Sequence, residues 1–162
     1  MIEVSFSYTK NEWIDGRRKY LLLSKTIKKS DIIALIIAAV VSIFSIIIYK
    51  FNTLNIILSI IVAVFTAMLL LLYVLQPIWI FRLTEKYHHP YKMKFSSENI
   101  SFESQGISSV LSWDIYSSYI ENDRYFYLLQ GKPNYVLIPK RAFLSDKDEL
   151  QFKKLLLNHF IK

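Results

Sequence analysis

The stretch IIALIIAAVVSIFSIIIY, residues 32–49, contains no charged side chain, and the other predictions from this sequence are built around it. Its length reaches the lower end of the roughly 17–25 apolar residues that a helix needs to cross a bilayer. A second uncharged stretch, IILSIIVAVFTAMLLLLYVL at residues 56–75, follows after the polar connector KFNTLN. Backbone groups in hydrocarbon must hydrogen-bond within their own segment, so both stretches should be helical. The sequence therefore predicts a transmembrane helical hairpin at residues 30–81, with spans at 32–49 and 54–80.

A signal peptide and a pair of soluble core helices both fit these stretches less well. A signal peptide has a shorter apolar region, which starts nearer the N-terminus and ends at a small-residue cleavage site. Core helices of a soluble domain are disfavoured by the length of the stretches and by the lack of charge between Lys50 and Arg82. The uncharged spans also argue against an ion or proton path, so the hairpin is expected to be an anchor. Close helix packing is expected at small polar residues of the spans, namely Ser42, Ser45, Ser59 and Thr66.

The chain carries a net charge of +7, and many of its basic residues flank the apolar stretches. Basic flanks stay in the cytoplasm when a membrane protein inserts, and the connector holds only Lys50. We therefore expect the protein in the cytoplasmic membrane, with both termini cytoplasmic. Because orientation explains the charge, a nucleic-acid partner is not expected. The flanking basic residues are Lys10, Arg17, Arg18, Lys19, Lys25, Lys28 and Lys29 before the hairpin, and Arg82, Lys86, Lys92 and Lys94 after it.

Residues 1–29 are predicted to form a strand and a basic helix. IEVSFSY, residues 2–8, alternates apolar and polar side chains, which is typical of a half-buried strand. Thr9 followed by Glu12 matches a capping box, so a helix is expected over residues 10–29. Its basic residues either set the topology or contact anionic lipid headgroups.

Residues 82–162 are predicted to form a small antiparallel sheet or barrel closed by a helix. Short β-prone segments alternate with turns rich in Gly, Pro and Asn. The expected strands lie at residues 91–95, 100–103, 107–113, 115–121, 124–130 and 135–138. The final helix is expected at residues 145–161, because Ser145 can cap it and acidic residues fill its first turn.

Several of these segments occur together in a known family. The matching sequences are Phe95 to Phe102, LSWDIYSSYIE at 111–121, YFYLL at 125–129 and, most specifically, VLIPKRAF at 136–143. In these segments, and in the order of its elements over nearly its whole length, the chain resembles the YcxB-like family of small bacterial membrane proteins. The resemblance implies a pleckstrin-homology-like cytosolic domain, completed here by the N-terminal strand. It implies no catalytic residues.

The sequence offers little for catalysis or for a cofactor. It contains no cysteine, and its three glycines do not form a phosphate-binding loop. His88 and His89 are adjacent, without the further ligands that a metal site needs. No serine lies in a nucleophile-elbow pattern. We therefore expect a protein that is not an enzyme and that needs no metal or cofactor.

The Lys140–Arg141 pair after Pro139 has two interpretations. It can be a solvated strand exit that the proline rigidifies, or it can contact an anion such as a lipid phosphate or an acidic partner. The first is favoured and the second stays open. The residues considered for anion or partner contact are Lys140, Arg141, Arg82, Lys86, Arg17 and Arg18. The aromatic residues expected in the core or as anchors are Trp113, Phe143, Phe152 and Phe160.

Together these features predict an α+β membrane protein that works by binding. Its expected partners, besides the bilayer, are another protein or anionic lipid, and a homo-oligomer stays open. One alternative is an immunity protein that protects the cell against a membrane-active toxin or bacteriocin. Another is an accessory subunit of a membrane transporter. Small size, a hairpin and the lack of a catalytic motif fit each of them.

Overall fold

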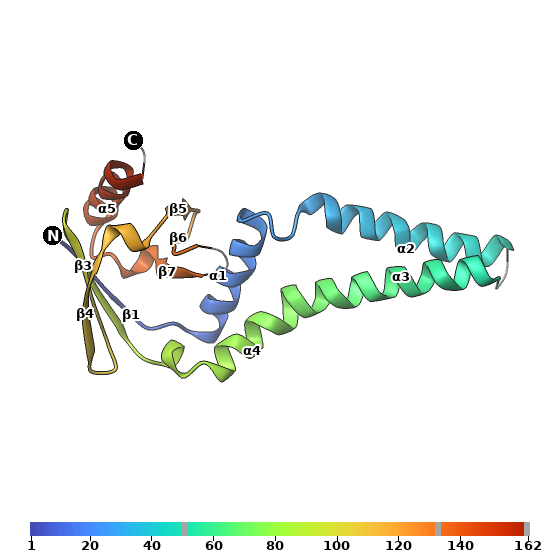
Figure 1. The fold of residues 1–162 in the computed structure, drawn as a ribbon, viewed down its shortest axis with the longest axis horizontal. Helices are drawn as coiled ribbons and strands as arrows, with labels where there is room; N and C mark the ends of the chain where they lie inside the picture. The colour runs from blue at the N-terminus through green and yellow to red at the C-terminus, as the bar shows by residue number, and fades with distance from the viewer. Residues whose placement is uncertain (50–51, 132–133, 161–162) are drawn as a thin grey trace. The chain divides into compact units, whose positions relative to one another are not determined.

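The computed structural model describes residues 1–49, 52–131 and 134–160, and it has an α+β fold (Figure 1). The chain divides into two compact units. The first, here called the α+β unit, is Met1–Gly16 with Thr84–Lys162, and the second, here called the hairpin unit, is Arg17–Leu83. Lys50 of the predicted connector lies outside the described residues.

The first sheet of the α+β unit joins the start of the chain to a segment that follows the hairpin unit. Its strands run in the order β1 (Ile2–Phe6), β2 (Tyr91–Phe95), β3 (Asn99–Ser104) and β4 (Ile107–Ser112), and all neighbours are antiparallel. The predicted N-terminal strand is thus an edge strand of this sheet. Between β3 and β4, Gln105 and Gly106 have φ angles of 53° and 74°. Two consecutive positive φ angles suit the tight two-residue turns of hairpins.

The second sheet consists of β5 (Ser118–Glu121), β6 (Tyr125–Leu129) and β7 (Tyr135–Pro139), again antiparallel. The strand predicted at residues 107–113 ends before Trp113, which begins the 3₁₀ turn Trp113–Ile115. The Ser112 side chain accepts a hydrogen bond from the Asp114 N–H and so favours this turn over continued pairing. The turn separates the two sheets.

The core of the α+β unit lies where both sheets meet helix α5 (Asp146–Phe160). The Phe152 ring centroid lies 4.6 Å from that of Phe95 on β2 and 5.2 Å from that of Phe126 on β6, and all three side chains are fully buried. The predicted cap is present, because Ser145 Oγ accepts from the Asp148 N–H at 3.2 Å. Residue 161, the predicted end of this helix, lies outside the described residues.

Helix α1 (Lys10–Leu23) is shorter than the predicted helix at residues 10–29. It starts as expected, with the Glu12 N–H donating to Thr9 Oγ1 at 3.2 Å. It ends early because Lys25 adopts a left-handed φ of 57°, and the Ile27 N–H turns back to the Leu21 carbonyl. Glycine usually takes the left-handed position at a helix end and so marks that end in a sequence. Here Lys25 takes it, so the sequence did not mark the end and the prediction placed it too late.

The hairpin unit contains two helices that are long and apolar enough to cross a membrane. One is α2 (Lys29–Tyr49); the other runs over Thr53–Leu83 as α3 (Thr53–Leu70), a π-helical segment (Leu71–Leu75) and α4 (Gln76–Leu83). Large apolar side chains, such as Ile36 and Val64, are exposed along both. The predicted spans agree with these helices to within a few residues at each end.

A short polar seam joins α2 to α3. Ser42 Oγ lies 2.9 Å from Ser59 Oγ, and Ser45 Oγ donates to Asn55 Oδ1 at 2.6 Å. Asn55 Nδ2 returns a bond to the Ser45 carbonyl at 3.2 Å, and the residue is only 2% exposed. Three of the four residues predicted for close packing therefore lie in the seam. Thr66 does not, because its hydroxyl donates to the Val62 carbonyl of its own helix.

Candidate functional site

The Lys140–Arg141 pair begins a 3₁₀ turn, Lys140–Ala142, directly after strand β7. Pro139 is the last residue of β7 and lies opposite Tyr125 on β6. The Lys140 N–H donates to the Arg124 carbonyl at 2.9 Å, which extends the contact with β6 by one bond. The sequence pattern at residues 135–143 is thus a strand exit.

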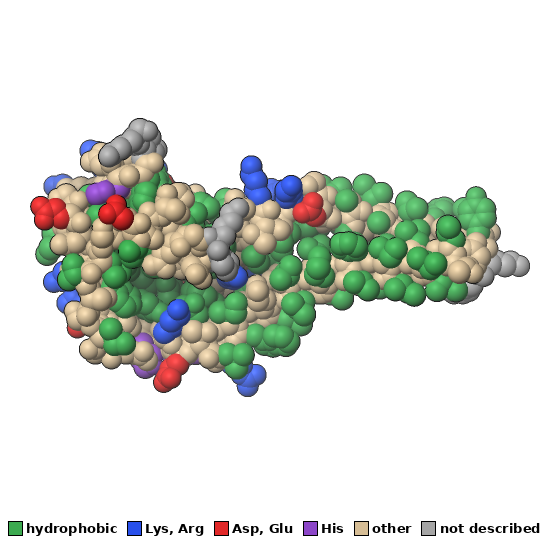
Figure 2. Space-filling model, viewed as in Figure 1, with side chains coloured by type: hydrophobic (Ala, Val, Ile, Leu, Met, Phe, Trp, Pro, Cys, Tyr) green, Lys and Arg blue, Asp and Glu red, His purple; other side chains and the backbone are tan. Residues whose placement is uncertain are grey.

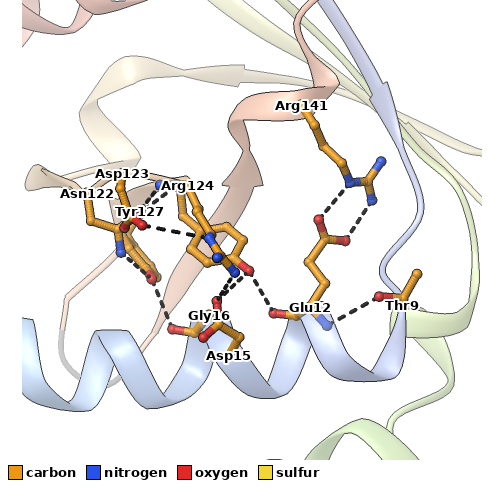
Figure 3. A network of polar contacts seen from close by, with 10 residues as sticks. Thr9, Glu12, Asp15, Gly16, Asn122, Asp123, Arg124, Tyr127 and Arg141 are labelled. Atoms are coloured by element: carbon orange, nitrogen blue, oxygen red, sulfur yellow. Dashed lines mark hydrogen bonds and ion pairs between the residues drawn. The ribbon is translucent and has the colours of Figure 1, made fainter.

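Arg141 makes a two-pronged contact with Glu12 of helix α1 (Figure 3). Its Nε donates to Glu12 Oε1 at 2.7 Å and its Nη2 donates to Glu12 Oε2 at 2.6 Å. Nη2 also donates to the Ser7 carbonyl at 3.0 Å. Paired, charge-assisted bonds of this kind are among the stronger polar contacts in proteins. They fasten the N-terminal segment to a turn 129 positions later in the chain.

Lys140 lies in a separate cluster of opposite charges. Its Nζ donates to Glu121 at 2.7 Å and pairs with Glu149 of α5 at 2.9 Å. Lys153 pairs with the second oxygen of Glu121 at 2.8 Å. Burial lowers the pKa of Lys140, but its hydrogen bonds to the two carboxylates outweigh burial, so the pKa lies above the ordinary value for lysine. Lys140 therefore stays charged and is paired with carboxylates of its own chain.

A cleft of about 580 Å³ lies beside these pairs, between helix α1 and the β6–β7 region. Its charged residues balance, and they are Glu12, Asp15 and Asp123 against Arg124, Lys140 and Arg141. Arg124 pairs with Asp15 at 3.6 Å and with Asp123 at 3.7 Å. A cleft with internally paired charges has little excess field to concentrate an anion.

Two tyrosines of β6 attach helix α1 to the second sheet. Tyr125 Oη donates to Asp15 Oδ2 at 2.9 Å. Tyr127 Oη donates to the Gly16 carbonyl at 3.0 Å (Figure 3). Burial is the main cause that raises the pKa of both phenols well above the ordinary value, so both stay protonated donors. The lack of a side chain at Gly16 permits this approach, since a Cβ there would lie 2.6 Å from Leu137 Cδ2.

The arrangement is suited to fastening rather than to anion capture. Lys140 and Arg141 each have carboxylate partners within the chain, so both have a structural role. The anion contact considered from the sequence stays a prediction. The sequence did not identify Asp15, Tyr125 or Tyr127, and it identified Glu12 only as part of a helix cap. These contacts join segments more than a hundred positions apart, and no local pattern marks such a pairing.

The other predicted contact residues have varied surroundings. In the hairpin unit, Arg18 Nε donates at 3.0 Å to the carbonyl of Tyr73, which lies in the π-helical segment, and Arg17 Nη2 lies 3.5 Å from Gln76 Oε1. Arg82 is exposed in the same unit. Lys86, in the α+β unit, is exposed and lies over the Tyr87 ring at 5.2 Å. Arg17 and Arg18 therefore also hold parts of the chain together.

The four aromatic residues that were expected in the core or as anchors differ in burial. Trp113 and Phe152 are buried, whereas Phe143 and Phe160 are half-buried. The Trp113 indole stacks on His159 at 4.4 Å and donates to the Ser96 carbonyl at 3.0 Å. All four rings pack around helix α5.

We predict that Glu121 makes stability depend on acid pH. Burial raises the pKa of its carboxyl, but hydrogen bonds from Lys140 and Lys153 outweigh burial and bring the pKa below the ordinary value. A lowered folded-state pKa gives stability that is present above the ordinary pKa and is lost as the pH falls through the folded value. Glu121→Gln should cost about 1–2 kcal/mol at pH 7. In denaturant titrations, the difference in unfolding free energy between wild type and variant should become smaller below about pH 4.5. A difference that stays constant from pH 7 to pH 3 would contradict this prediction.

Within the described residues, no group of three or more His, Cys, Asp or Glu side chains is placed to hold a metal ion. His88 and His89 end a short 3₁₀ helix and start the following loop, and His89 lies 4.0 Å from Glu85.

Comparison with known proteins identifies one segment. Residues 95–156 match the family described as YcxB-like protein. The chain therefore carries a YcxB-like domain. No curated protein and no solved structure matches the chain.

The YcxB-like domain extends from the end of β2 into α5, and it includes Phe95, Phe126 and Phe152 of the core and the Lys140–Arg141 turn. This confirms the resemblance seen in the sequence, over a shorter range than the sequence layout had indicated. Strand β1, helix α1 and the hairpin unit lie outside the matched range. Glu12, which Arg141 binds, is therefore contributed from outside the YcxB-like domain.

Proposed function

We propose that this protein is a non-enzymatic, membrane-anchored binding protein. The hairpin unit spans the cytoplasmic membrane twice and holds the α+β unit, with both termini, on the cytoplasmic face. The α+β unit binds a partner there. The observation that carries the proposal is the exposure of large apolar side chains along two helices whose long stretches at residues 32–49 and 56–75 carry no charge.

The hairpin has the polarity that a bilayer requires. Apolar side chains such as Ile37, Ile47 and Phe65 point outward, while the polar atoms of Ser42 and Asn55 are buried between the helices. In water the reverse arrangement is expected, because exposed apolar surface of this extent is costly. The basic residues before α2 and after α4 favour the cytoplasmic side for both ends.

The order of elements supports a pleckstrin-homology-like fold for the α+β unit. A four-stranded antiparallel sheet is followed by a three-stranded one and by a C-terminal helix that packs on both. The unit has two hollows, beside the Lys140–Arg141 turn and among the aromatic residues around Tyr8, where a partner can dock. Binding is therefore the activity that its surface can support.

The absence of cysteine allows a direct test of topology. Thr53→Cys places a single thiol at the exposed start of α3, and Ser108→Cys places one on exposed strand β4. A membrane-impermeant maleimide added to intact spheroplasts should label the first variant. It should label the second only after lysis. Labelling of both before lysis, or recovery of the protein in the soluble fraction, would refute the membrane anchor.

Crosslinking with mass spectrometry in native membranes tests the binding role. A recurrent protein or anionic lipid crosslinked to the α+β unit would support it. A stoichiometric transporter would point to an accessory subunit, and a secreted toxin would point to an immunity protein. An α+β unit without crosslinks above those of an unrelated membrane protein would refute the binding role.

We predict that Asn55→Leu weakens the hairpin. Leucine has a similar volume but leaves Ser45 Oγ without its acceptor at 2.6 Å and removes the bond to the Ser45 carbonyl. Interhelical hydrogen bonds in membranes are worth about 0.6–2 kcal/mol. Unfolding by sodium dodecyl sulfate in mixed micelles, followed by circular dichroism, should show a loss of that size. Ile57→Leu, on an exposed position of the same helix, should not change it; equal behaviour of both variants would contradict the role of the seam.

A further inference from the structure

The α+β unit contains a second hollow, of about 320 Å³, that the charged cleft does not include. It lies among β2, β3, the β3–β4 turn, β7 and the start of α1, and we call it the aromatic groove. Figure 2 shows hydrophobic side chains gathered in a hollow on this face of the unit. The aromatic residues that line the groove are Tyr8, Trp13, Tyr87, Tyr91, Phe102 and Tyr135.

The rings of the groove support one another, which gives it a fixed shape. Trp13 stacks on Tyr87 with 3.8 Å between ring centroids. Tyr8 meets Trp13 and Tyr91 edge-on, each at 5.2 Å, and its hydroxyl donates to the Leu137 carbonyl. Burial raises the pKa of the Tyr8 phenol well above its ordinary value, so this bond persists. A preformed aromatic site loses little entropy when it binds a flat molecule.

The charge of the groove is one-sided, unlike that of the cleft beside Arg141. Lys86 is exposed at its edge, and no Asp or Glu occurs among the described residues that line it. The Lys86 Nζ lies 5.2 Å from the Tyr87 centroid. A cationic ligand would be repelled by this ammonium group, although aromatic rings alone would attract one. An anionic ligand is complementary to it.

The size of the groove limits the ligand further. Ligand sites of proteins usually measure about 300–1,000 Å³, and a dry cavity of about 150 Å³ holds one benzene ring. The aromatic groove therefore suits a molecule with about two fused rings. Gln105, whose backbone is held in the left-handed region, adds an amide to the lining.

We propose that the aromatic groove binds a small aromatic carboxylate. The flat ring system lies against the aromatic side chains, and the carboxylate faces Lys86. This inference rests on the proposed binding function and names its ligand class. It does not depend on the membrane anchor, because every lining residue belongs to the α+β unit.

The test uses 2-naphthoate as the probe and the full chain in detergent, with its three tryptophans labelled as 5-fluorotryptophan. In fluorine NMR, the Trp13 signal should shift saturably, while the Trp79 and Trp113 signals should not. Lys86→Gln should weaken 2-naphthoate binding about tenfold, as loss of a charge-assisted contact does. The same variant should leave binding of the neutral 2-naphthamide unchanged.

A matched pair of variants tests the position. Ile107 lines the groove, and Ile107→Tyr should abolish the shift of the Trp13 signal. Val110 is exposed on the same strand and does not line the groove, so Val110→Tyr should leave the shift unchanged. Absence of a saturable Trp13 shift in wild type would overturn the proposal. So would equal affinity for naphthoate and naphthamide, or equal effects of the two tyrosine variants. The maleimide experiment can fail without affecting these results, so failure of the membrane anchor and failure of the groove are distinguishable.

Discussion

Phe152→Ala is expected to cost about 3–5 kcal/mol of unfolding free energy and to unfold much of the α+β unit near physiological temperature. The side chain is fully buried. The centroid of its ring lies 4.6 Å from that of Phe95 and 5.2 Å from those of Phe126 and Phe143. Removing it opens a cavity where both sheets meet α5. A loss of this size is a large share of the roughly 5–15 kcal/mol that stabilises a typical domain.

Thermal melting followed by near-ultraviolet circular dichroism measures the effect. The midpoint of the wild type should fall by more than about 10 °C in the variant. Leu157→Ala is the matched control, because Leu157 lies on the same helix but is partly exposed. It should lower the midpoint by a few degrees at most. If both variants melted alike, α5 would not be the element that joins the two sheets.

Glu12→Gln and Arg141→Gln are each expected to cost about 1.5–3 kcal/mol, and the double variant should cost clearly less than their sum. Both single changes break the same two-pronged contact, with bonds of 2.7 and 2.6 Å. Once one partner is gone, removing the other loses little more. A coupling energy of about 1–2 kcal/mol is therefore expected from the cycle.

Hydrogen exchange localises the effect. In Glu12→Gln, amides of residues 1–16 should exchange faster, because the N-terminal segment is no longer fastened to the Lys140–Ala142 turn. Glu98→Gln, at an exposed position of the same unit, is the control and should change neither stability nor exchange. The contact would add nothing to the attachment of α1 if the free-energy costs of Glu12→Gln and Arg141→Gln were additive in the double variant. The same would follow if Glu12→Gln and Glu98→Gln showed equal hydrogen exchange.

The sequence allowed the elements with strong local signals to be predicted. The absence of charge marked α2 and α3, alternation marked most strands, and Ser145 with its acidic neighbours marked α5. Helix α1 was predicted too long because its end depends on the backbone of Lys25. A break was predicted at Asp114 alone, between strands at residues 107–113 and 115–121, whereas the structure has a longer one from Trp113 to Ser117. The Ser112 side-chain bond that favours the turn is not visible in the alternation of apolar residues.

The candidate site was less predictable than the fold. Lys140 and Arg141 were noticed as cations, but their partners lie on other elements: Glu149 on α5, Glu121 on β5, 19 positions away, and Glu12 on α1, 129 positions away. The π-helical turn at Leu71–Leu75 has no residue signature either, and the Tyr73 carbonyl within it accepts from Arg18 Nε. Such pairings arise from tertiary structure and not from local pattern.

The pairing of β1 with β2 fixes the order in which this chain can mature. Ile2–Phe6 is synthesised well before its partner Tyr91–Phe95, which is made only after both apolar helices are complete. Strand β1 must therefore wait, without this partner, through the synthesis of the whole hairpin. Closing so long a loop is entropically costly and slow compared with local pairing. Strand β1 is thus made before the hairpin but reaches its final neighbour only after it.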